Sequence, residues 1–156
     1  MWPAYLAARI MAEDDRVAAQ TVEEQLESSL DSVDQAEDTV LRLATAMGFD
    51  EDDQHRIGIA VRECMVNAVV HGNRYNANKK VRLSVSHGAE RLTVRIQDEG
   101  EGFEVTELPD PLAPENLMRS SGRGIFLIRS FVDELLIRRL EPAGMEFVLV
   151  KYLVAK

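Results

Sequence analysis

The sequence predicts an α+β fold, a two-layer sandwich in which helices cover one face of a mostly antiparallel sheet. Two observations carry this prediction. Two segments of helical period stand together in the first half, and most segments of strand period follow in pairs separated by short turns. Strands joined by short turns pair antiparallel, so each pair predicts a hairpin. The length of 156 residues suits one domain, which we assign to residues 21–156, after an N-terminal appendage of residues 1–20.

Two amphipathic helices are expected in the first half of the chain. Ser32 and Gln35 form a capping box ahead of apolar residues at helical spacing, and Gly48 fits the end of this helix. Asp50 is a good N-cap for the second helix, and the three acids that follow it complement the helix dipole. The second helix should end at Gly72.

Five strands are expected. Four of them show an apolar period of two or lie beside a turn signal, and the first is less regular and could form an edge strand. The expected strands are residues 22–30, 81–85, 92–96, 134–140 and 145–154.

A long stretch without periodicity, residues 98–124, follows the first predicted hairpin. It contains three prolines and four glycines. In a compact domain a connection of this length is usually a functional loop or lid. A further helix is expected from about Ile125.

The charge of the chain is unevenly distributed. The 18 basic and 27 acidic side chains give a formal net charge of −9 at pH 7. Fourteen of the acids and three of the bases lie in residues 1–53, so the remainder is close to neutral. Phosphate backbones are bound by clustered Lys and Arg, so nucleic acid is not expected as a partner. A small anion could still bind the near-neutral part.

Cysteine usage and hydropathy indicate the compartment. Cys64 is the only cysteine, which excludes an intramolecular disulfide and a zinc site built on paired cysteines. The first residues lack the basic region of a signal peptide, and no apolar run approaches the length of about 20 residues that a membrane span needs. We expect a soluble, cytoplasmic protein that does not bind membranes.

Two interpretations of residues 1–20 stay open. Pro3 could open a short helix that places Trp2, Leu6 and Ile10 on one side, or the segment could be disordered. The acids that follow could recognise a basic partner or form a solvated face. These acids are Glu23, Glu24, Glu27, Asp31 and Asp34.

The first of three segments with candidate chemistry lies on the second predicted helix. Glu63 and Asn67 are four residues apart and therefore share one face, with His71 one further turn along. Their neighbours are apolar, and a carboxylate or an amide buried there is costly unless it is hydrogen-bonded or bound to a cation. A satisfied buried pair and a cation-binding pair both fit this pattern.

The second segment, residues 98–103, follows directly on a predicted strand. Gly100 and Gly102 allow the backbone to approach a ligand closely, and Asp98 is suited to accept a hydrogen bond from the exocyclic amine of a base. A dinucleotide-binding loop is excluded because the third glycine is absent and no helix pattern follows. A simple glycine turn at the end of a strand is the alternative.

The third segment, residues 120–125, lies at the start of the next predicted helix. Free backbone N–H groups and the positive end of the helix dipole suit a phosphate, and Arg123 adds a positive charge. A Walker loop is excluded because the Gly-Lys-Ser/Thr ending is absent. A glycine-rich helix start with a solvated arginine is the alternative.

Together the three segments resemble the nucleotide-binding boxes of the GHKL (Bergerat-fold) ATPases. Residues 63–73, ECMVNAVVHGN, are similar to the N box in the form typical of bacterial anti-sigma-factor serine kinases. Residues 98–103, DEGEGF, resemble the G1 box, and residues 121–128, SGRGIFLI, resemble the G2 segment. The order and the separations also fit, and the resemblance covers roughly residues 21–154.

The resemblance implies ATP and Mg²⁺ as ligands. Glu63 would be the base that orients or deprotonates the attacking hydroxyl, Asn67 would coordinate the Mg²⁺ that bridges the ATP phosphates, and Asp98 would bind the adenine amine. The base and phosphates would be held by His71, Gly100, Gly102, Phe103, Ser121, Gly122, Arg123 and Gly124.

One position departs from the family pattern. After Gly144 the family often has a Thr that supports the adenine-binding Asp, and here Met145 follows. We therefore expect the hydrogen bond to Asp98 to come from water or from another group.

The function implied is that of an ATP-dependent protein serine kinase and anti-sigma factor. It would phosphorylate a small anti-anti-sigma (STAS) domain and, in its other state, sequester a sigma factor, with homodimerisation through the first strand and the sheet edge. The alternative is a catalytically inactive switch that binds ATP or ADP and controls a partner protein. Retention of both Glu63 and Asn67 favours the kinase.

Overall fold

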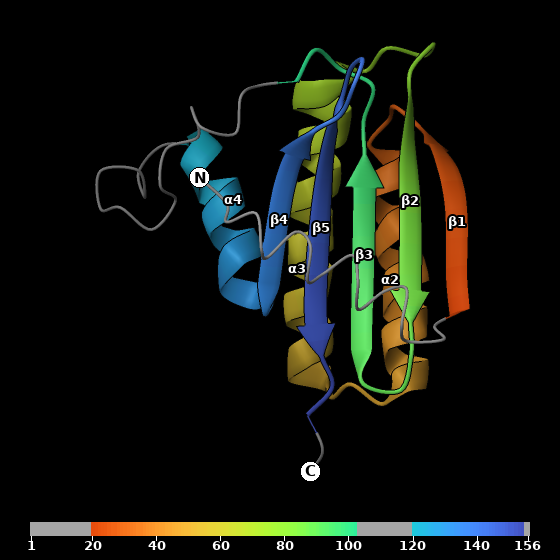
Figure 1. Cartoon of the computed structure of the whole chain (residues 1–156), viewed down its shortest axis with the longest axis vertical. Helices are drawn as coiled ribbons and strands as arrows, with labels where there is room; N and C mark the ends of the chain where they lie inside the picture. Colours follow the sequence, from red (N-terminus) through yellow and green to blue (C-terminus); the bar gives the residue numbers. More distant parts are fainter. Residues whose placement is uncertain (1–19, 103–119, 155–156) are drawn as a thin grey trace.

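The computed structural model describes residues 20–102 and 120–154. A five-stranded sheet carries helices on one face (Figure 1). The elements are β1 (Gln20–Glu27), α2 (Asp31–Met47), α3 (Glu51–Val66), the π-helical η1 (Asn67–Gly72), β2 (Lys80–His87), β3 (Arg91–Gln97), α4 (Ser120–Phe131), β4 (Glu134–Arg139) and β5 (Met145–Tyr152).

The strand order is β1-β2-β3-β5-β4, and all four pairings are antiparallel. Two hairpins, β2–β3 and β4–β5, form the centre and one side of the sheet, and β1 forms the opposite edge. The α+β fold, both hairpins and the position of the first strand at an edge are therefore confirmed. The strand ends differ from the predicted ends by no more than three residues.

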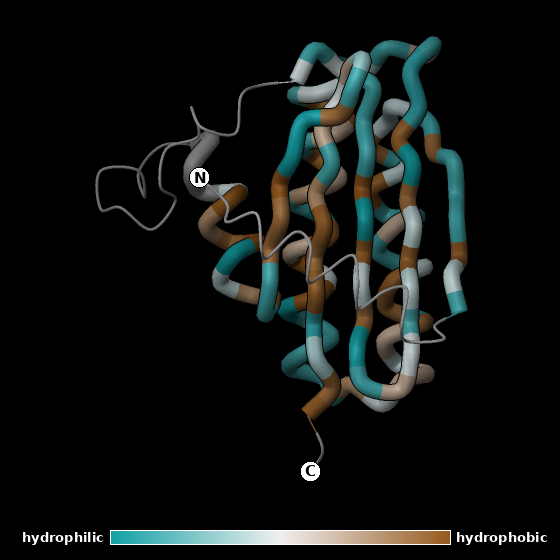
Figure 2. Tube along the Cα trace, viewed as in Figure 1, coloured by the Kyte–Doolittle hydropathy of each residue, from teal (hydrophilic) through white to brown (hydrophobic). Residues whose placement is uncertain are grey.

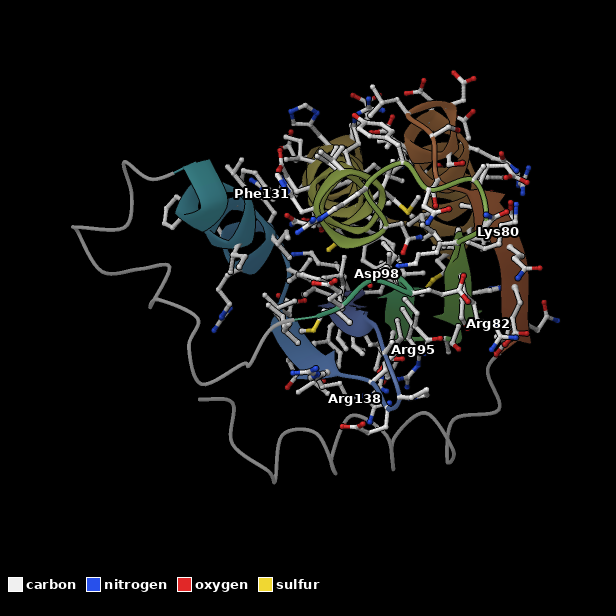
Figure 3. All side chains as sticks on the ribbon, turned by 90° about the horizontal axis from the view of Figure 1, so that it is seen from above. Lys80, Arg82, Arg95, Asp98, Phe131 and Arg138 are labelled. Carbon is white, nitrogen blue, oxygen red and sulfur yellow. The ribbon has the colours of Figure 1, made fainter. Side chains whose placement is uncertain are left out.

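The hydrophobic core lies between the sheet and the helices. Viewed along the sheet, the helices form one layer and the strands the other, with Asp98 between them (Figure 3). Helix α4 contacts α3 and β4, so it completes the helical layer at the side of the sheet away from β1. Buried core side chains include Val33, Val40, Val61, Met65, Leu83, Ile96 and Ile128.

Three of the four predicted helix-end signals in the first two helices are confirmed. Gly48 ends α2 with φ 101°, a left-handed conformation that favours glycine. The Asp50 side chain accepts the N–H of Asp53 (2.8 Å) and caps α3. The capping box at Ser32 was wrong, because α2 begins at Asp31 and the Ser32 hydroxyl donates to the carbonyl of Glu27 (2.7 Å) instead.

The end expected at Gly72 is also confirmed, although at Asn67 the α-helical bonding gives way to a π-helix, in which the N–H of Asn73 donates to the carbonyl of Ala68 (2.8 Å). The start of the next helix needs correction. Helix α4 begins at Ser120, five residues before the expected start. Residues 1–19, 103–119 and 155–156 lie outside the described part of the chain, and with them the appendage, most of the predicted loop and Phe103.

No helix among the described residues is both long enough and apolar enough to cross a bilayer.

The cap at α3 gives a test of the helix start. Asp50→Ala should lower the free energy of unfolding by about 1 kcal/mol, because the N–H of Asp53 loses its acceptor. Asp52→Ala is the matched control, since this exposed acid lies in the same turn and contributes only through the helix dipole, about 0.3 kcal/mol. Urea denaturation measures both, and equal losses would contradict the capping role.

Candidate functional site

Residues of the site are arranged along one continuous helical axis. Helix α3 and η1 carry Glu63, Asn67 and Gly72 in order. Glu63 and Gly72 are nine residues apart, about 13 Å at the α-helical rise. At one end of this span lies Asp98, which follows β3, and at the other end lies the first turn of α4. Residues 98–103 and the start of α4 thus contact the same helical segment, one near Gly72 and the other near Glu63.

Asp98 is buried, with 5% of its surface exposed. Its Oδ1 accepts the backbone N–H groups of Gly100 (2.9 Å) and Met145 (3.1 Å), and its own N–H donates to the carbonyl of Met145 (3.0 Å). Burial raises the pKa of the Asp98 carboxyl, and the two N–H donors act in the opposite direction. Both of these side-chain hydrogen bonds go to Oδ1, which leaves Oδ2 as the acceptor for a ligand.

Three glycines from three different segments enclose Asp98. A Cβ at Gly72 would overlap the carboxylate, one at Gly100 would overlap the carbonyl of Gly72, and one at Gly144 would overlap the carbonyl of Asp98. Gly144 also has φ 107°, a left-handed conformation. These close approaches bring η1, the end of β3 and the β4–β5 turn into contact. Glycine is therefore required at these three positions, because a side chain there would keep the three segments apart.

Asn73 ties this end of the site to the sheet. Its side chain is buried, its Nδ2 donates to the hydroxyl of Ser28 (2.9 Å) and to the carbonyl of Lys80 (3.0 Å), and its Oδ1 accepts the N–H of Glu99 (2.8 Å). It thus joins the ends of β1 and β2 to the residue that follows Asp98. Sequence reasoning missed this role, although the position of Asn73 directly after the helix end was a usable signal.

Glu63 and Asn67 lie under the start of α4. A Cβ built on Gly124 would stand 3.2 Å from Glu63 Oε2 and 3.7 Å from Asn67 Nδ2. Asn67 Nδ2 is buried and has no hydrogen-bond partner. Among the described residues, no other buried side-chain nitrogen or oxygen is left in this state. An amide left in this state is costly unless a ligand satisfies it. The alternative of a pair satisfied within the protein is thus not what the structure shows for Asn67.

The remaining predicted site residues are located by their helices rather than by a contact with Glu63, Asn67 or Asp98. Gly122, Arg123 and Ser121 lie in the first turn of α4, where backbone N–H groups have no partner within the helix. His71 lies in η1 with an exposed side chain, because the change to π-helix ends the α-helical spacing that would stack it on Asn67.

The departure at Met145 is resolved by the backbone. The expected support for Asp98 from another group comes from the N–H of Met145 itself and from that of Gly100. The side chain of Met145 is buried in the core, where a hydroxyl is not needed to hold the carboxylate. The sequence could not show this, because a backbone donor leaves no mark on residue type.

Comparison with known proteins assigns this arrangement to a family. Residues 26–151 match the model of the histidine kinase-like ATPase domain. The chain belongs to this family. Serine-protein kinase RsbW of Bacillus velezensis is 30% identical over 123 residues, 74% of each chain. The protein of the same name from Bacillus subtilis is 28% identical over 121 residues, 74% of each chain, and that from Staphylococcus epidermidis is 28% identical over 139 residues, 85% of this chain and 86% of the relative.

The GHKL resemblance, in its anti-sigma-factor serine-kinase form, is thereby confirmed. Membership of the histidine kinase-like ATPases makes this an ATP-binding domain. The matched residues run from the end of β1 into β5 and include all three boxes.

A divalent cation fits the donor set of this GHKL site. Among the described residues no group of three or more His, Cys, Asp and Glu side chains could hold a metal ion alone. Mg²⁺ that arrives on phosphates needs only one or two protein ligands and keeps several waters. The side-chain oxygens of Asn67 and Glu63 are ligands of the type that Mg²⁺ accepts, and the unpartnered Nδ2 of Asn67 is a donor suited to a phosphate oxygen.

Gly72 provides a test of the close approach to Asp98. Gly72→Ala should destabilise the fold by about 1–3 kcal/mol, since the new methyl group must displace a buried carboxylate. Gly58→Ala is the control within α3, because its Cβ would meet mainly the flexible end of Glu37 (3.2 Å), and helix propensity should give a gain of up to about 1 kcal/mol. Opposite signs in thermal unfolding are expected, and stabilisation by both substitutions would contradict the packing described.

The raised pKa of Asp98 predicts a pH dependence. A buried acid whose pKa is raised on folding costs stability as pH rises above its ordinary value of about 3.9, because the folded state resists ionisation. Asp98→Asn keeps an oxygen that can accept both N–H groups but cannot ionise. The variant should therefore gain stability relative to the unsubstituted protein between acid and neutral pH, and the gain should vanish below about pH 3.9. Urea titrations at several pH values measure the difference, with exposed Glu101→Gln as the control.

Proposed function

We propose that this protein is an ATP-dependent protein serine kinase and anti-sigma factor that phosphorylates a STAS-type anti-anti-sigma partner. The observation that carries the proposal is the placement of Glu63 and Asn67 together beneath Gly124, near the start of α4. Membership of the histidine kinase-like ATPases and similarity to proteins named Serine-protein kinase RsbW support it.

Adenine binding is assigned to the end of the site at Asp98. The free Oδ2 of this carboxylate would accept the exocyclic amine, while Oδ1 is held by two backbone donors. Gly100 and Gly102 would admit the base close to the backbone, and His71 and Phe103 would line it. A charge-assisted hydrogen bond of this kind contributes about 1.5–3 kcal/mol.

Phosphate binding is assigned to the other end. Backbone N–H groups at the start of α4, in the stretch Ser121, Gly122 and Arg123, would bind phosphate oxygens, Gly124 would leave room for the phosphates beside Glu63 and Asn67, and the Arg123 charge would add to the positive end of the dipole. Asn67 would hold Mg²⁺ together with the phosphates. Bound Mg²⁺ supplies neutralisation of the charge that develops on them.

Glu63 is assigned the role of base. Its carboxylate beside Asn67 would orient the serine hydroxyl of the partner and accept its proton as the oxygen bonds to the γ-phosphorus and the bond to the bridging β–γ oxygen breaks. The products are phosphoserine and ADP. Positioning and charge neutralisation supply most of the catalysis in such a transfer.

Three of the acids considered from sequence are used within the domain. Asp34 pairs with Arg62 (2.7 Å), Glu27 pairs with Lys80 (2.5 Å), and Glu24 accepts from Thr39. These contacts favour a structural role for that acidic face. Sigma-factor binding, homodimerisation along the open edge of β1 and a cytoplasmic location are part of the proposal.

Transfer and binding are tested separately. With radiolabelled ATP and a cognate STAS protein, Glu63→Gln should bind nucleotide but transfer phosphate about 10²–10⁴-fold more slowly. Asp98→Asn should weaken ADP about 10–100-fold, through loss of the acceptor at Oδ2. At a hundredfold excess over Kd, ADP with Mg²⁺ should stabilise the unsubstituted protein by about 2.7 kcal/mol.

Exposed Glu101→Gln, which removes one neighbouring charge, should change neither property. Nucleotide binding without transfer to any STAS partner would replace the kinase with the inactive switch. No stabilisation by ADP would contradict the nucleotide site itself.

A further inference from the structure

Strand β5 is buried on both of its faces. Six consecutive residues, Met145–Val150, are buried, whereas a strand with one solvated face alternates between buried and exposed residues. Figure 2 shows hydrophobic residues gathered along β4 and β5, in contrast to the mostly hydrophilic β1. Met145, Phe147 and Leu149 join the core beneath the helices, so the alternate residues point to the opposite face.

The opposite face carries a contiguous apolar patch, which we call the outer-face patch: Thr93, Leu136, Val148 and Val150. Val148 pairs with Leu136 of β4, and Val150 pairs with Thr93 of β3, so the four residues are neighbours across three strands. Their exposed fractions are only 0% for Val148 and Val150, 2% for Thr93 and 3% for Leu136. Leu136, Val148 and Val150 stand outside the core cluster beneath the helices.

No element among residues 20–102 and 120–154 covers this face, because the helices of the described part lie in the other layer (Figures 1 and 3). Full burial on an uncovered face is a contradiction unless something else lies on it. Charged groups border the same face. Glu146 is 1% exposed and accepts from Arg138 (2.6 Å) and Gln97, and Arg82, Arg95 and Arg138 lie on the side of the sheet away from the helices (Figure 3).

We propose that residues 1–19 fold back across the sheet and cover the outer-face patch within the same chain. Trp2, Leu6 and Ile10 recur at helical spacing and supply an apolar stripe. Three consecutive acids, Glu13–Asp15, give the segment a small net negative charge against its two bases, Arg9 and Arg16, opposite in sign to Arg95 and Arg138 beside the patch. Apolar and charged parts of the segment thus complement both parts of the face.

Residues 1–19 are long enough to reach the outer-face patch from the start of β1. Residue 19 joins β1 at Gln20, on the edge strand, and four strand spacings separate β1 from β4, about 19 Å. Nineteen residues span about 28 Å as a helix and about 60 Å when extended.

The segment 103–119 is a poorer candidate for this role. Its flanks lie on the helical side of the sheet. Gly102 stands against Met145, whose side chain belongs to the core, and Gly124 stands against Glu63 of α3. A second copy of the chain is the remaining occupant, and it differs from an internal cover in its dependence on concentration.

Trp2 is the only tryptophan, so its fluorescence reports on the segment in the full chain without a label. We expect emission at shorter wavelength, and weaker quenching by acrylamide, than in the urea-unfolded chain. Both should be unchanged by dilution. Leu136→Arg should shift the emission to that of the unfolded chain and raise the quenching constant to match, with the far-UV circular dichroism preserved.

Leu30→Arg is the matched control, since Leu30 is an exposed leucine (54%) at the start of α2 and should leave Trp2 protected. If Leu136→Arg fails to fold, the double variant Leu6→Asp and Ile10→Asp decides the question, because it changes only the segment. This variant should also release Trp2 and leave nucleotide binding intact.

Three results would overturn the proposal: a Trp2 as accessible in the native protein as in urea, a Trp2 still protected in the double variant, or protection that disappears on dilution as a dimer dissociates in light scattering. The last result would assign the patch to a second copy. None of these outcomes depends on kinase activity.

Discussion

The contact between Gly72 and Asp98 is the constraint on which the site depends. A buried carboxylate is tolerated only where donors meet it, and here two backbone N–H groups do so from Gly100 and Met145. Those donors can reach Asp98 only because Gly72, Gly100 and Gly144 carry no side chain at the points of closest approach. The end of a helix, the end of a strand and a hairpin turn are thereby held at one place.

Once this end is held, the helix axis determines the rest. Glu63 and Asn67 lie a fixed distance back along α3 from Gly72, and α4 can settle over them because Gly124 presents no side chain. The change to π-helix at Asn67 occurs between the two ends, and π-helical turns occur often at functional sites. One rigid element therefore sets the separation between the acceptor at Asp98 and the groups at Glu63, as a nucleotide that spans both requires.

Periodicity and turn chemistry predicted most of the fold, because both act over a few residues. The hairpins, Gly48 and Asp50 follow from local geometry alone. Ser32 failed because its hydroxyl found the carbonyl of Glu27 in the chain that arrives from β1. The start of α4 was placed late because Ser and Gly are poor helix formers, and packing of Gly124 against α3 outweighs that local preference. Asn73 and the donor of Met145 were missed because their partners are distant in sequence.

The burial pattern of β5 indicates more than the presence of a strand, because both of its faces are buried. The run Met145–Val150 breaks the alternation that a one-sided sheet imposes, and that break is visible in the sequence as hydrophobic residues beside the expected inward ones. The cost of exposing Val148 and Val150 to water would be about 1.5–3 kcal/mol for each side chain. Apolar burial therefore favours a third layer over this run, as proposed above. Charge contributes less, because only three of the 14 acids in residues 1–53, Glu13, Asp14 and Asp15, lie in residues 1–19, together with Arg9 and Arg16. Apolar burial is therefore the main contribution that favours a covered outer face.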